Sequence, residues 1–237
     1  MNILIANDDG IHAPGIEKLA AIAAKFGKVW VTAPANQCSG MSHRLTIFRN
    51  LPIEEVEFPI PVEAAWKIGG TPADCVKLAI TTLMPVKPDV VLSGINKGHN
   101  GGLDIAYSGT IGAAMEALIN DVPAIAVSND FDSDFSIIDK YLEGILADLL
   151  AQPPSLTEIW NVNFPVGSCK GIRRNVRIAP MGMYESFYTA LTLEDGAKAM
   201  KPDANRLTLD RAPEGTDLHA VLDGYIAIGK VKCVVKQ

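Results

Sequence analysis

Two adjacent carboxylates follow the first apolar run of the chain, and their types and spacing suit metal chemistry. Residues 3–6 are apolar, and Asn7, Asp8, Asp9 and Gly10 come directly after them. Neighbouring carboxylates repel each other, and Mg²⁺ or Mn²⁺ removes that repulsion because these hard cations prefer oxygen ligands. The alternative is a plain Asx turn with a type I turn, since Asn, Asp and Gly are frequent turn residues. On its own, this tetrapeptide favours the turn.

Two later loops carry further groups that suit a metal ion or a phosphate. Residues 37–43 contain Ser39, whose hydroxyl oxygen is a candidate ligand, and Gly40, which lets the backbone approach a ligand closely. Residues 93–102 are rich in Gly and Ser, expose backbone N–H groups, and contain Asn96, whose carbonyl oxygen is a candidate metal ligand. The alternatives are a polar loop at 37–43, which is favoured for that loop alone, and a flexible loop at 93–102, which is about equally supported. Neither loop matches a P-loop or a dinucleotide-binding pattern.

A helix start supplies the fourth group. Ser108, Gly109 and Thr110 open a helical segment, and Ser108 is a good N-cap residue. The same geometry presents free N–H groups and the positive end of the helix dipole to a phosphate. Capping alone is an adequate explanation of these residues. Taken together, however, the acidic pair, the hydroxyl loop, the Gly-rich loop and the helix start indicate a metal-dependent phosphate site.

Other catalytic patterns do not fit the sequence. The four histidines lack the spacing of the H-E-x-x-H zinc motif, and no G-x-S-x-G nucleophile elbow is found. Asp8 and Asp9 are adjacent, which differs from the D-x-D arrangement of phosphatases that use an aspartyl nucleophile.

The expected elements place these four groups at one edge of a sheet. Apolar runs predict buried parallel strands, and apolar residues at spacings of three and four predict helices between them. Alternation of strands and helices indicates a parallel sheet with helices on both faces, in which sites lie outside the carboxyl ends of the strands. The expected strands are residues 3–6, 29–32, 89–92 and 124–127. The loops expected to gather at their ends are residues 7–11, 34–43, 93–107 and 128–132.

The remaining segments give weaker or less regular signals. Gly27 is expected to cap the helix that begins near Ile16, and residues 44–68 are expected to form exposed strands. Thr71, Pro72 and Asp74 predict a further helix start. Expected later elements are a helix over 136–150, a strand over 159–164, β-rich segments at 172–178, 205–209 and 225–235, and an aperiodic extension at 180–203 that serves oligomerisation.

Composition excludes several classes of protein. The chain has 237 residues and a formal net charge of −6, and it lacks a dense basic tract, which argues against a nucleic-acid polymer as partner. With 48% hydrophobic residues, neither disorder nor a collagen-like structure describes the chain. Its start lacks the basic region of a signal peptide, and no apolar run approaches about 18 residues. The cysteines form no C-x-x-C pair, so we expect a soluble cytoplasmic protein without a membrane partner; they are Cys38, Cys75, Cys169 and Cys233.

At these residues the chain resembles the SurE family of survival-protein nucleotidases. The resemblance runs along most of the chain, and several separate blocks in the same order make it specific. The blocks are residues 5–16, 69–76, 88–98 and 107–116, with 215–217 and 224–226 resembling the C-terminal end of the family. One departure lies at residues 38–43, where many relatives carry Arg-Ser-Gly-Ala-Ser-Asn and this chain carries Cys-Ser-Gly-Met-Ser-His. The missing arginine removes one phosphate donor.

The resemblance implies a phosphatase for nucleoside 5′-monophosphates that uses one Mg²⁺ or Mn²⁺ ion and works as a homodimer or homotetramer. It also implies an α/β fold, with a three-layer Rossmann-like core of mostly parallel sheet over residues 1–165 and a C-terminal β-rich oligomerisation arm over 166–237. The metal ligands implied are Asp8, Asp9, Ser39 and Asn96, of which Asp8 and Asp9 are also the catalytic candidates. The phosphate and substrate groups are Asn96, Ser108, Gly109 and Thr110, together with Gly40 and His43.

The mechanism and the exact function remain open at this point. Either a water molecule attacks the phosphate, oriented or deprotonated by Asp9, or an aspartate attacks and forms an aspartyl-phosphate. We favour water, because a carboxylate that binds a metal is a poorer nucleophile. The alternative functions are a nucleotide-binding or sensing module with little turnover and a structural oligomer. Within the enzyme class, nucleoside 3′-monophosphates, short polyphosphate or sugar phosphates are further candidate substrates.

Overall fold

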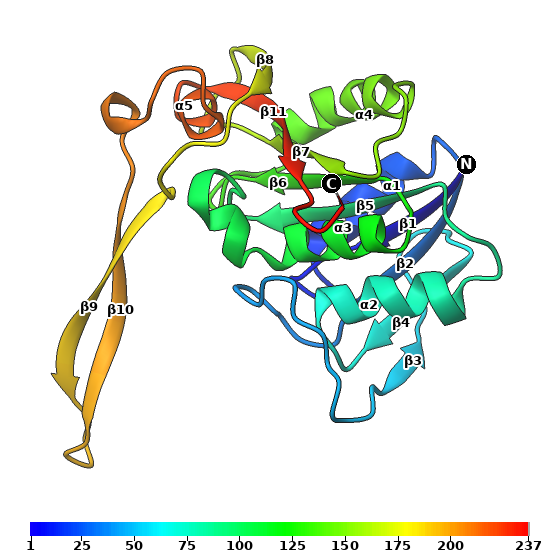
Figure 1. The fold of residues 1–237 in the computed structure, drawn as a ribbon, viewed down its shortest axis with the longest axis horizontal. Coiled ribbons are helices and arrows are strands. Elements are labelled where there is room, and N and C mark those ends of the chain that lie inside the picture. Colours follow the sequence, from blue (N-terminus) through cyan, green and yellow to red (C-terminus); the bar gives the residue numbers. More distant parts are fainter. Residues whose placement is uncertain (237) are drawn as a thin grey trace.

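The centre of the fold is a sheet of parallel strands. In the computed structural model, which describes residues 1–236, nine strands form this sheet (Figure 1). Their order is β3 (Ile53–Glu55), β4 (Ala64–Ile68), β2 (Lys28–Pro34), β1 (Asn2–Ala6), β5 (Val90–Lys97), β6 (Ala124–Asn129), β7 (Glu158–Asn163), β11 (Tyr225–Lys232) and β8 (Gly171–Val176). The six strands from β4 to β7 are parallel, whereas β3 and β11 run antiparallel to β4 and β7. The predicted α/β class with a mostly parallel sheet is confirmed.

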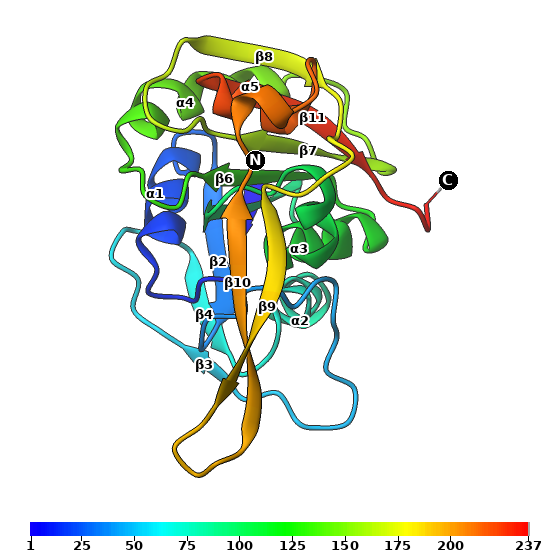
Figure 2. The same cartoon turned by 90° about the vertical axis from the view of Figure 1, so that its left-hand side faces the viewer.

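Helices cover both faces of this sheet, which makes three layers. Helices α1 (Pro14–Ala23) and α4 (Ser136–Leu150) pack on one face, and α2 (Pro72–Leu78) and α3 (Gly109–Ile119) pack on the other. Figure 2 shows the two pairs on opposite sides of the sheet. The side chains of β1 alternate accordingly, with Ile3 and Ile5 in the first core and Leu4 and Ala6 in the second. Both faces of β1 are therefore buried, which explains why its sequence is continuously apolar.

Strand order identifies the edge at which a ligand site is expected. The chain adds β2 and β4 on one side of β1 and then returns to add β5, β6 and β7 on the other side. This reversal between β1 and β5 is a topological switch point, and the loops at the carboxyl ends of these two strands diverge to leave a crevice. The loops after β1 and β5 carry the predicted metal ligands Asp8, Asp9 and Asn96.

Helix α2 begins where the sequence predicts. The Thr71 hydroxyl accepts a hydrogen bond from the backbone N–H of Asp74 at 3.2 Å, and the Asp74 carboxylate accepts one from the backbone N–H of Thr71 at 2.9 Å. This capping box satisfies two backbone donors that the first turn of a helix leaves free. A π-helical segment (Ala79–Leu83) continues α2.

Residues 44–68 differ from the exposed strands that we expected. The first part, residues 44–48, forms no strand, and only the short β3 is exposed. Strand β4, by contrast, lies inside the sheet between β2 and β3, so that Trp66 and Ile68 are buried. The expectation failed because these apolar residues alternate with polar ones, a pattern that an edge strand and this interior strand share.

Two glycines act differently from our expectation. Gly27 does not cap α1 with a left-handed backbone; instead a Cβ at this position would lie 2.0 Å from the carbonyl oxygen of Met1, so the residue permits a close approach of the chain start. Residues 93–97 are strand rather than loop, because β5 continues through Gly94 and pairs with β6 on both sides of an irregularity between Ser93 and Asn96. A Cβ on Gly94 would lie 2.2 Å from the carbonyl oxygen of Val127 in β6.

The C-terminal part of the chain adds two strands to the sheet and also forms a hairpin outside it. Strands β8 and β11 with helix α5 (Asp217–Leu222) pack at the sheet edge, whereas β9 (Tyr184–Thr192) and β10 (Lys198–Arg206) form a hairpin that projects from the body (Figure 1). Short 3-10 turns, η2 (Gly102–Tyr107) and η3 (Leu209–Arg211), complete the elements. The aperiodic stretch at 180–203 is thus mostly this hairpin, since a two-stranded ribbon away from the core has no buried face to impose a pattern. The boundary at 165 stays a prediction, and residue 237 lies outside the described residues.

Two sequence-based expectations about the chain as a whole can be compared with the structure. Each of the four cysteines, all within the described residues, is free. Among residues 1–236 we find no helix with the length and apolar character needed to cross a membrane.

Two glycines in helices make a matched pair for testing how tightly α1 packs on β5. A Cβ on Gly15 in α1 would lie 2.1 Å from the carbonyl oxygen of Ile95, whereas one on Gly144 in the exposed part of α4 would meet no atom within 4 Å. We expect Gly15→Ala to lower the free energy of unfolding by about 2 kcal/mol or more through overpacking. Gly144→Ala should raise it by about 0.5–1 kcal/mol, because alanine is the better helix former. Urea unfolding measures both, and equal signs would contradict the packing described here.

Candidate metal and phosphate site

The turn after β1 is built by Asn7 and leaves the two carboxylates that follow for other partners. The buried Asn7 amide donates to the carbonyl oxygen of Gly10 at 2.9 Å, and its side-chain oxygen accepts the backbone N–H of Gly10 at 3.2 Å. Gly10 has a φ of +106°, a conformation that glycine adopts without strain. The expected turn is therefore present, and it leaves Asp8 and Asp9 at the carboxyl edge of the sheet, where their role as metal ligands stays a prediction.

Asp8 is a buried carboxylate at the start of helix α3. It is 3% exposed, and its Oδ1 accepts a hydrogen bond from the Thr110 hydroxyl at 2.6 Å. Burial raises the pKa of Asp8 from its ordinary value of 3.8 to about 6, although the Thr110 hydrogen bond opposes the shift; the charge of Asp9 adds to it. The hydrogen bond from Thr110 thus holds Asp8 in place but offsets only part of the cost of burying its negative charge.

Asp9 is less buried and is fixed by two donors. Its Oδ2 accepts the backbone N–H of Lys97 at 3.1 Å, and its Oδ1 lies 3.4 Å from the amide nitrogen of Gln37. Burial raises the pKa of Asp9, while the Lys97 N–H and the Gln37 amide act in the opposite direction. These contacts join the loop after β1 to the end of β5 and to the loop after β2.

Gln37 also places Ser39 beside Asp9. Its amide nitrogen donates to the Ser39 hydroxyl oxygen at 3.1 Å, so that one side chain contacts both predicted ligands. The backbone N–H of Cys38 donates to the carbonyl oxygen of Asp8 at 2.7 Å, which fixes this loop against β1. We did not predict Gln37 as a site residue. The signal that could have identified it is its position two residues before Ser39.

Asn96 lies at the end of β5, next to the residue that holds Asp9. Its amide nitrogen donates to the carbonyl oxygen of Gly98 at 2.7 Å. Within residues 1–236 its side-chain oxygen has no hydrogen-bond donor. That oxygen is therefore available to a ligand, as the carboxylates are.

The start of α3 comes unusually close to Asp8. A Cβ on Gly109 would lie 2.9 Å from the Cβ of Asp8, so glycine is needed for this approach. The Ser108 hydroxyl accepts the backbone N–H of Ile111 at 3.1 Å, which is the expected N-cap bond. The N–H group of Gly109 makes no hydrogen bond to the described residues, whereas that of Thr110 bonds to the Asp8 carboxylate and helps to lower its pKa. The Gly109 N–H and the positive helix end are features that suit an anion next to the carboxylates.

The rest of the loop after β2 lies on α3 and its preceding turn. The backbone N–H of Ser42 donates to the carbonyl oxygen of Tyr107 at 2.9 Å, and its hydroxyl donates to that of Ala106 at 2.8 Å. Gly40 has a φ of +73°, and a Cβ there would meet no atom within 4 Å. Gly40 is thus required by the backbone conformation of an exposed turn rather than by a close approach.

The structure pairs His43 with a buried carboxylate that sequence reasoning missed. His43 Nε2 lies 2.7 Å from Glu116 Oε2, and the Lys77 ammonium lies 3.1 Å from Glu116 Oε1. Glu116 is 1% exposed, and although burial raises its pKa, hydrogen bonds from His43, Lys77 and Asn120 outweigh burial and lower it. Among the described residues no hydrogen bond of His43 reaches Asp8 or Asp9, so the structure gives it an anchoring contact, and its substrate role stays a prediction.

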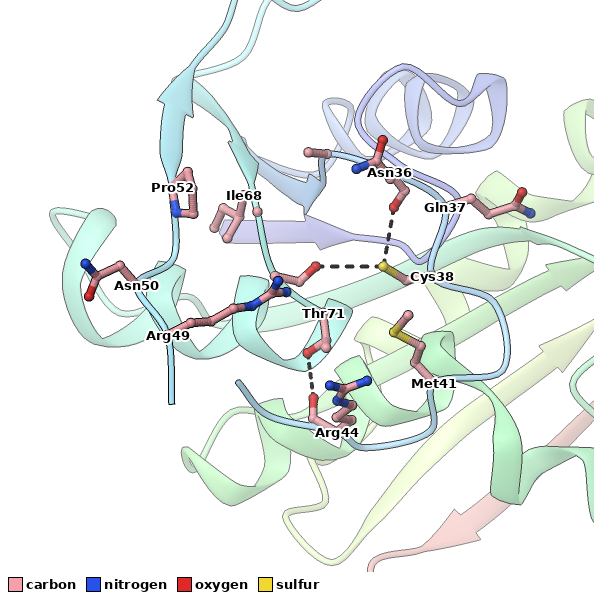
Figure 3. Close-up of a pocket in the computed structure, with 13 residues that line it drawn as sticks. Asn36, Gln37, Cys38, Met41, Arg44, Arg49, Asn50, Pro52, Ile68 and Thr71 are labelled. Carbon is pink, nitrogen blue, oxygen red and sulfur yellow. Dashed lines mark hydrogen bonds between the residues drawn. The ribbon is translucent and has the colours of Figure 1, made fainter. Parts of the chain in front are cut away.

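Two cavities flank these residues, and Gln37 lines both. One, of about 460 Å³, lies over Cys38 and Thr71, with Arg44 and Arg49 beside Thr71 (Figure 3). The other, of about 490 Å³, lies on the far side of Asp9 and Asn96 and is lined by Lys97, Phe131 and Phe135 among others. A further cavity of about 640 Å³ lies at the opposite edge of the sheet, near Asp89 and Pro123, where the strands begin. It is separated from the predicted site residues.

The chemical types of the groups at this site indicate which ligands would suit them. The groups brought together are two carboxylates, a hydroxyl, an amide oxygen and the free Gly109 N–H of a helix start. Oxygen donors without sulfur or imidazole suit a hard divalent cation, and the N–H at the helix start suits an anion. A raised pKa at both carboxylates indicates that the protein itself does not neutralise them, which is the electrostatic condition a cation would relieve.

Comparison with known proteins gives one consistent result. Residues 3–186 match the family model described as survival protein SurE. A protein of Pelotomaculum thermopropionicum named 5′-nucleotidase SurE is 37% identical over 235 residues, covering 98% of this chain and 89% of the relative. One of Heliobacterium modesticaldum with the same name is 36% identical over 232 residues, covering 96% and 85%. The crystal structure of the SurE protein from Aquifex aeolicus superposes with a TM-score of 0.82 at 34% identity, covering 98% and 93% of the two chains.

The burial of Asp8 predicts a stability effect in the metal-free protein. The folded-state pKa of about 6 exceeds the ordinary 3.8, so the folded state binds more protons between these values and its stability falls as pH rises from about 4 to about 6. Asp8→Asn removes the charge but keeps an oxygen for Thr110. With EDTA present, we expect it to raise the free energy of unfolding by about 3 kcal/mol at pH 8 and by little at pH 4. Denaturant unfolding at both pH values measures this.

The matched control is Asp139→Asn, which removes an exposed carboxylate whose salt bridge to Lys18 contributes little. We expect less than about 1 kcal/mol of change at either pH. A wild-type-like stability of Asp8→Asn at pH 8 would contradict the assignment of Asp8 as an uncompensated buried charge.

Proposed function

This chain belongs to the SurE family, and we propose that it is a 5′-nucleotidase that uses one divalent metal ion to hydrolyse nucleoside 5′-monophosphates to nucleoside and phosphate. The curated relatives carry the name 5′-nucleotidase SurE. The observation that carries the proposal is the meeting of uncompensated oxygen ligands with the start of α3 and its free Gly109 N–H. A cation and N–H donors together position a phosphate monoester and neutralise its charge, which is the main requirement of phosphoryl transfer.

The proposed metal ligands are the side-chain oxygens of Asp8, Asp9, Ser39 and Asn96. Their support is that Gln37 contacts both Asp9 and Ser39 and that Lys97, next to Asn96, fixes Asp9. When bound, Mg²⁺ or Mn²⁺ supplies a Lewis acid that neutralises charge on the phosphate. The oxygen-only ligand set is what either of these ions prefers.

The phosphate is proposed to bind at the start of α3. The N–H group of Gly109 donates to a phosphate oxygen, and the positive end of the helix dipole adds to the attraction. Thr110 also positions the carboxylate, because its hydroxyl donates a hydrogen bond to Asp8 Oδ1 at 2.6 Å. The helix thereby fixes the distance between the phosphate position and the carboxylate.

Asp9 is proposed to orient the attacking water and to accept its proton. The Lys97 N–H and the Gln37 amide hold the Asp9 carboxylate from two directions, so it keeps one orientation. Water attack forms a new P–O bond, the bond from phosphorus to the nucleoside oxygen breaks, and that oxygen takes up a proton as the nucleoside leaves. The Thr110 hydroxyl and the Gln37 amide contribute by positioning the two carboxylates, and positioning is most of what phosphoryl transfer requires.

The projecting hairpin is proposed to join two or more copies of this chain into a homodimer or homotetramer. In the register of β9 with β10, Tyr188 lies opposite Pro202 and Ala190 opposite Met200, so these residues share one face with Tyr184. Tyr188 is 71% exposed. An apolar face on an unsupported ribbon is costly in water, and a second copy would cover it.

A phosphate-release assay tests the enzymatic proposal. The panel contains nucleoside 5′- and 3′-monophosphates, ribose 5-phosphate and short polyphosphate, each with EDTA and with Mg²⁺ or Mn²⁺ restored. We expect EDTA to abolish release from the 5′-monophosphates and metal to restore it. Asp8→Asn and Asp9→Asn should each lower kcat/KM at least about 100-fold, because each removes a charged oxygen at the reacting group.

Asp139→Asn is again the control, and it should keep full activity because its side chain lies on the exposed surface between α1 and α4. Metal binding and a raised Tm without phosphate release from any member of the panel would favour a nucleotide-binding module. Release that persists in EDTA would contradict the metal assignment.

The oligomer proposal has its own test. We expect Tyr188→Asp to lower the molar mass measured by light scattering after size-exclusion chromatography, because a charge would be placed in the apolar face. Thr189→Asp, on the opposite face of β9, is the matched control and should leave the mass unchanged. A wild-type molar mass of a single chain, or an equal effect of both variants, would contradict this role of the hairpin.

A further inference from the structure

We propose that the cavity beside Asp9 and Asn96 holds the base of the nucleotide, with the ring of Phe131 stacking on it. The proposal rests on the proposed nucleotidase function and names the part of the protein that distinguishes a nucleotide from other phosphate monoesters. The cavity has a volume of about 490 Å³, within the range of small-molecule sites.

The first argument is continuity with the phosphate position. Asp9 and Asn96 line this cavity and are also two of the proposed metal ligands. A nucleotide whose phosphate lies at these residues therefore has the open space of the cavity directly beside it. The opposite walls come from the start of α1, with Pro14 and Gly15, and from the loop after β6.

The second argument is the aromatic side chain in that loop. Phe131 is 52% exposed although it lies at the carboxyl edge of the sheet, next to the site. The ammonium of Lys97 lies 4.3 Å from the centre of its ring, which is a cation–π contact. An exposed ring at a cavity wall offers a flat π surface, and nucleobases bind such surfaces by stacking.

The third argument is that the loop carrying Phe131 is held in place before any ligand binds. The buried Asn129 amide donates to the carbonyl oxygens of Asp134 at 2.9 Å and Ser133 at 3.4 Å, which closes the loop on itself. Asp130, also buried, forms an ion pair with Arg206 at the base of the hairpin. The ring is therefore preorganised, which reduces the ordering cost of stacking.

The cavity on the other side of Gln37 has different chemistry. Its charged side chains are Arg44 and Arg49, and the residues of the described chain that line it include no aromatic side chain. Such a lining suits an anion rather than a neutral ring. Of the two cavities, the one with Phe131 and Phe135 is therefore the better match for a nucleobase.

Phe131→Ala tests this assignment, and adenosine 5′-monophosphate and ribose 5-phosphate are the probes. They share the phosphate and the sugar, so only the base differs. We expect kcat/KM for the nucleotide to fall about 5- to 100-fold, the range produced by losing one base–aromatic stack. Hydrolysis of ribose 5-phosphate should be unchanged. Phe131→Tyr retains the ring and should keep the wild-type ratio of the two substrates.

A matched control lies in the other cavity. Arg49→Ala should leave the ratio of the two substrates at its wild-type value, because the base does not reach it. Unchanged Tm values, expected for half-exposed Phe131 and exposed Arg49, show that each variant is folded. An unchanged ratio in Phe131→Ala, or a loss of nucleotide preference in Arg49→Ala, would overturn the assignment.

A binding measurement separates this inference from the proposed function. Adenosine has the base but no phosphate, so its dissociation constant, measured by calorimetric titration, does not depend on turnover. Phe131→Ala should weaken adenosine binding about 5- to 100-fold. If the wild type hydrolyses nothing yet shows this difference, the nucleotidase proposal fails and the base site stands. If the wild type hydrolyses the nucleotide and Phe131→Ala behaves like it in both measurements, the base site fails alone.

Discussion

The contact between the buried Asp8 carboxylate and the first turn of α3 determines how the rest of the site is arranged. A carboxylate with so little exposure is costly unless it has partners, and the side-chain partner here is the Thr110 hydroxyl, with the backbone N–H groups of Asp8 and Thr110 beside it. The contact requires the helix to come so close that Gly109 has no room for a side chain. It therefore sets the position of the helix start relative to the carboxylate pair, and the loops from β2 and β5 pack around that fixed pair.

Two buried carboxylates near this helix show how burial leads to different properties. Glu116, six residues beyond Thr110 in α3, has His43, Lys77 and Asn120 as partners, and its pKa is lowered. Asp8 has a neutral hydroxyl and neutral backbone N–H groups as partners and an anionic neighbour, so burial dominates and its pKa is raised. The first pattern is that of an anchor, which holds the loop after β2 on α3. The second leaves a buried charge without a cationic partner, and perturbed carboxylates of this kind are typical of functional sites.

Much of the fold was predictable because buried strands and helix faces require apolar residues at regular positions in the sequence. The apolar runs at β1, β2 and β6, the capping box at Thr71 and the start of α3 all follow from local rules. The switch point then explains why Asp8, Asp9 and Asn96 meet. Other features depend on contacts distant in sequence. Gly94 in β5 gave a loop signal because its partner in β6 was unknown, and the link between His43 and Glu116 spans 73 residues. The hairpin has no buried face, so its strands left no periodic pattern.

The central position of β1 in the sheet has a consequence for the folding of the newly synthesised chain. β1 is synthesised first, yet one of its two neighbours is β5, and the Thr110 hydroxyl that Asp8 needs lies 102 residues further along the chain. Until β5 has left the ribosome, one edge of β1 has no partner strand, and until α3 has followed, Asp8 lacks the Thr110 hydroxyl. Closing such long loops is entropically costly and makes parallel sheets slow to form. A nascent or truncated chain that ends before α3 therefore contains the acidic motif but not its folded arrangement, and the two carboxylates reach that arrangement only after the first half of the chain has been synthesised.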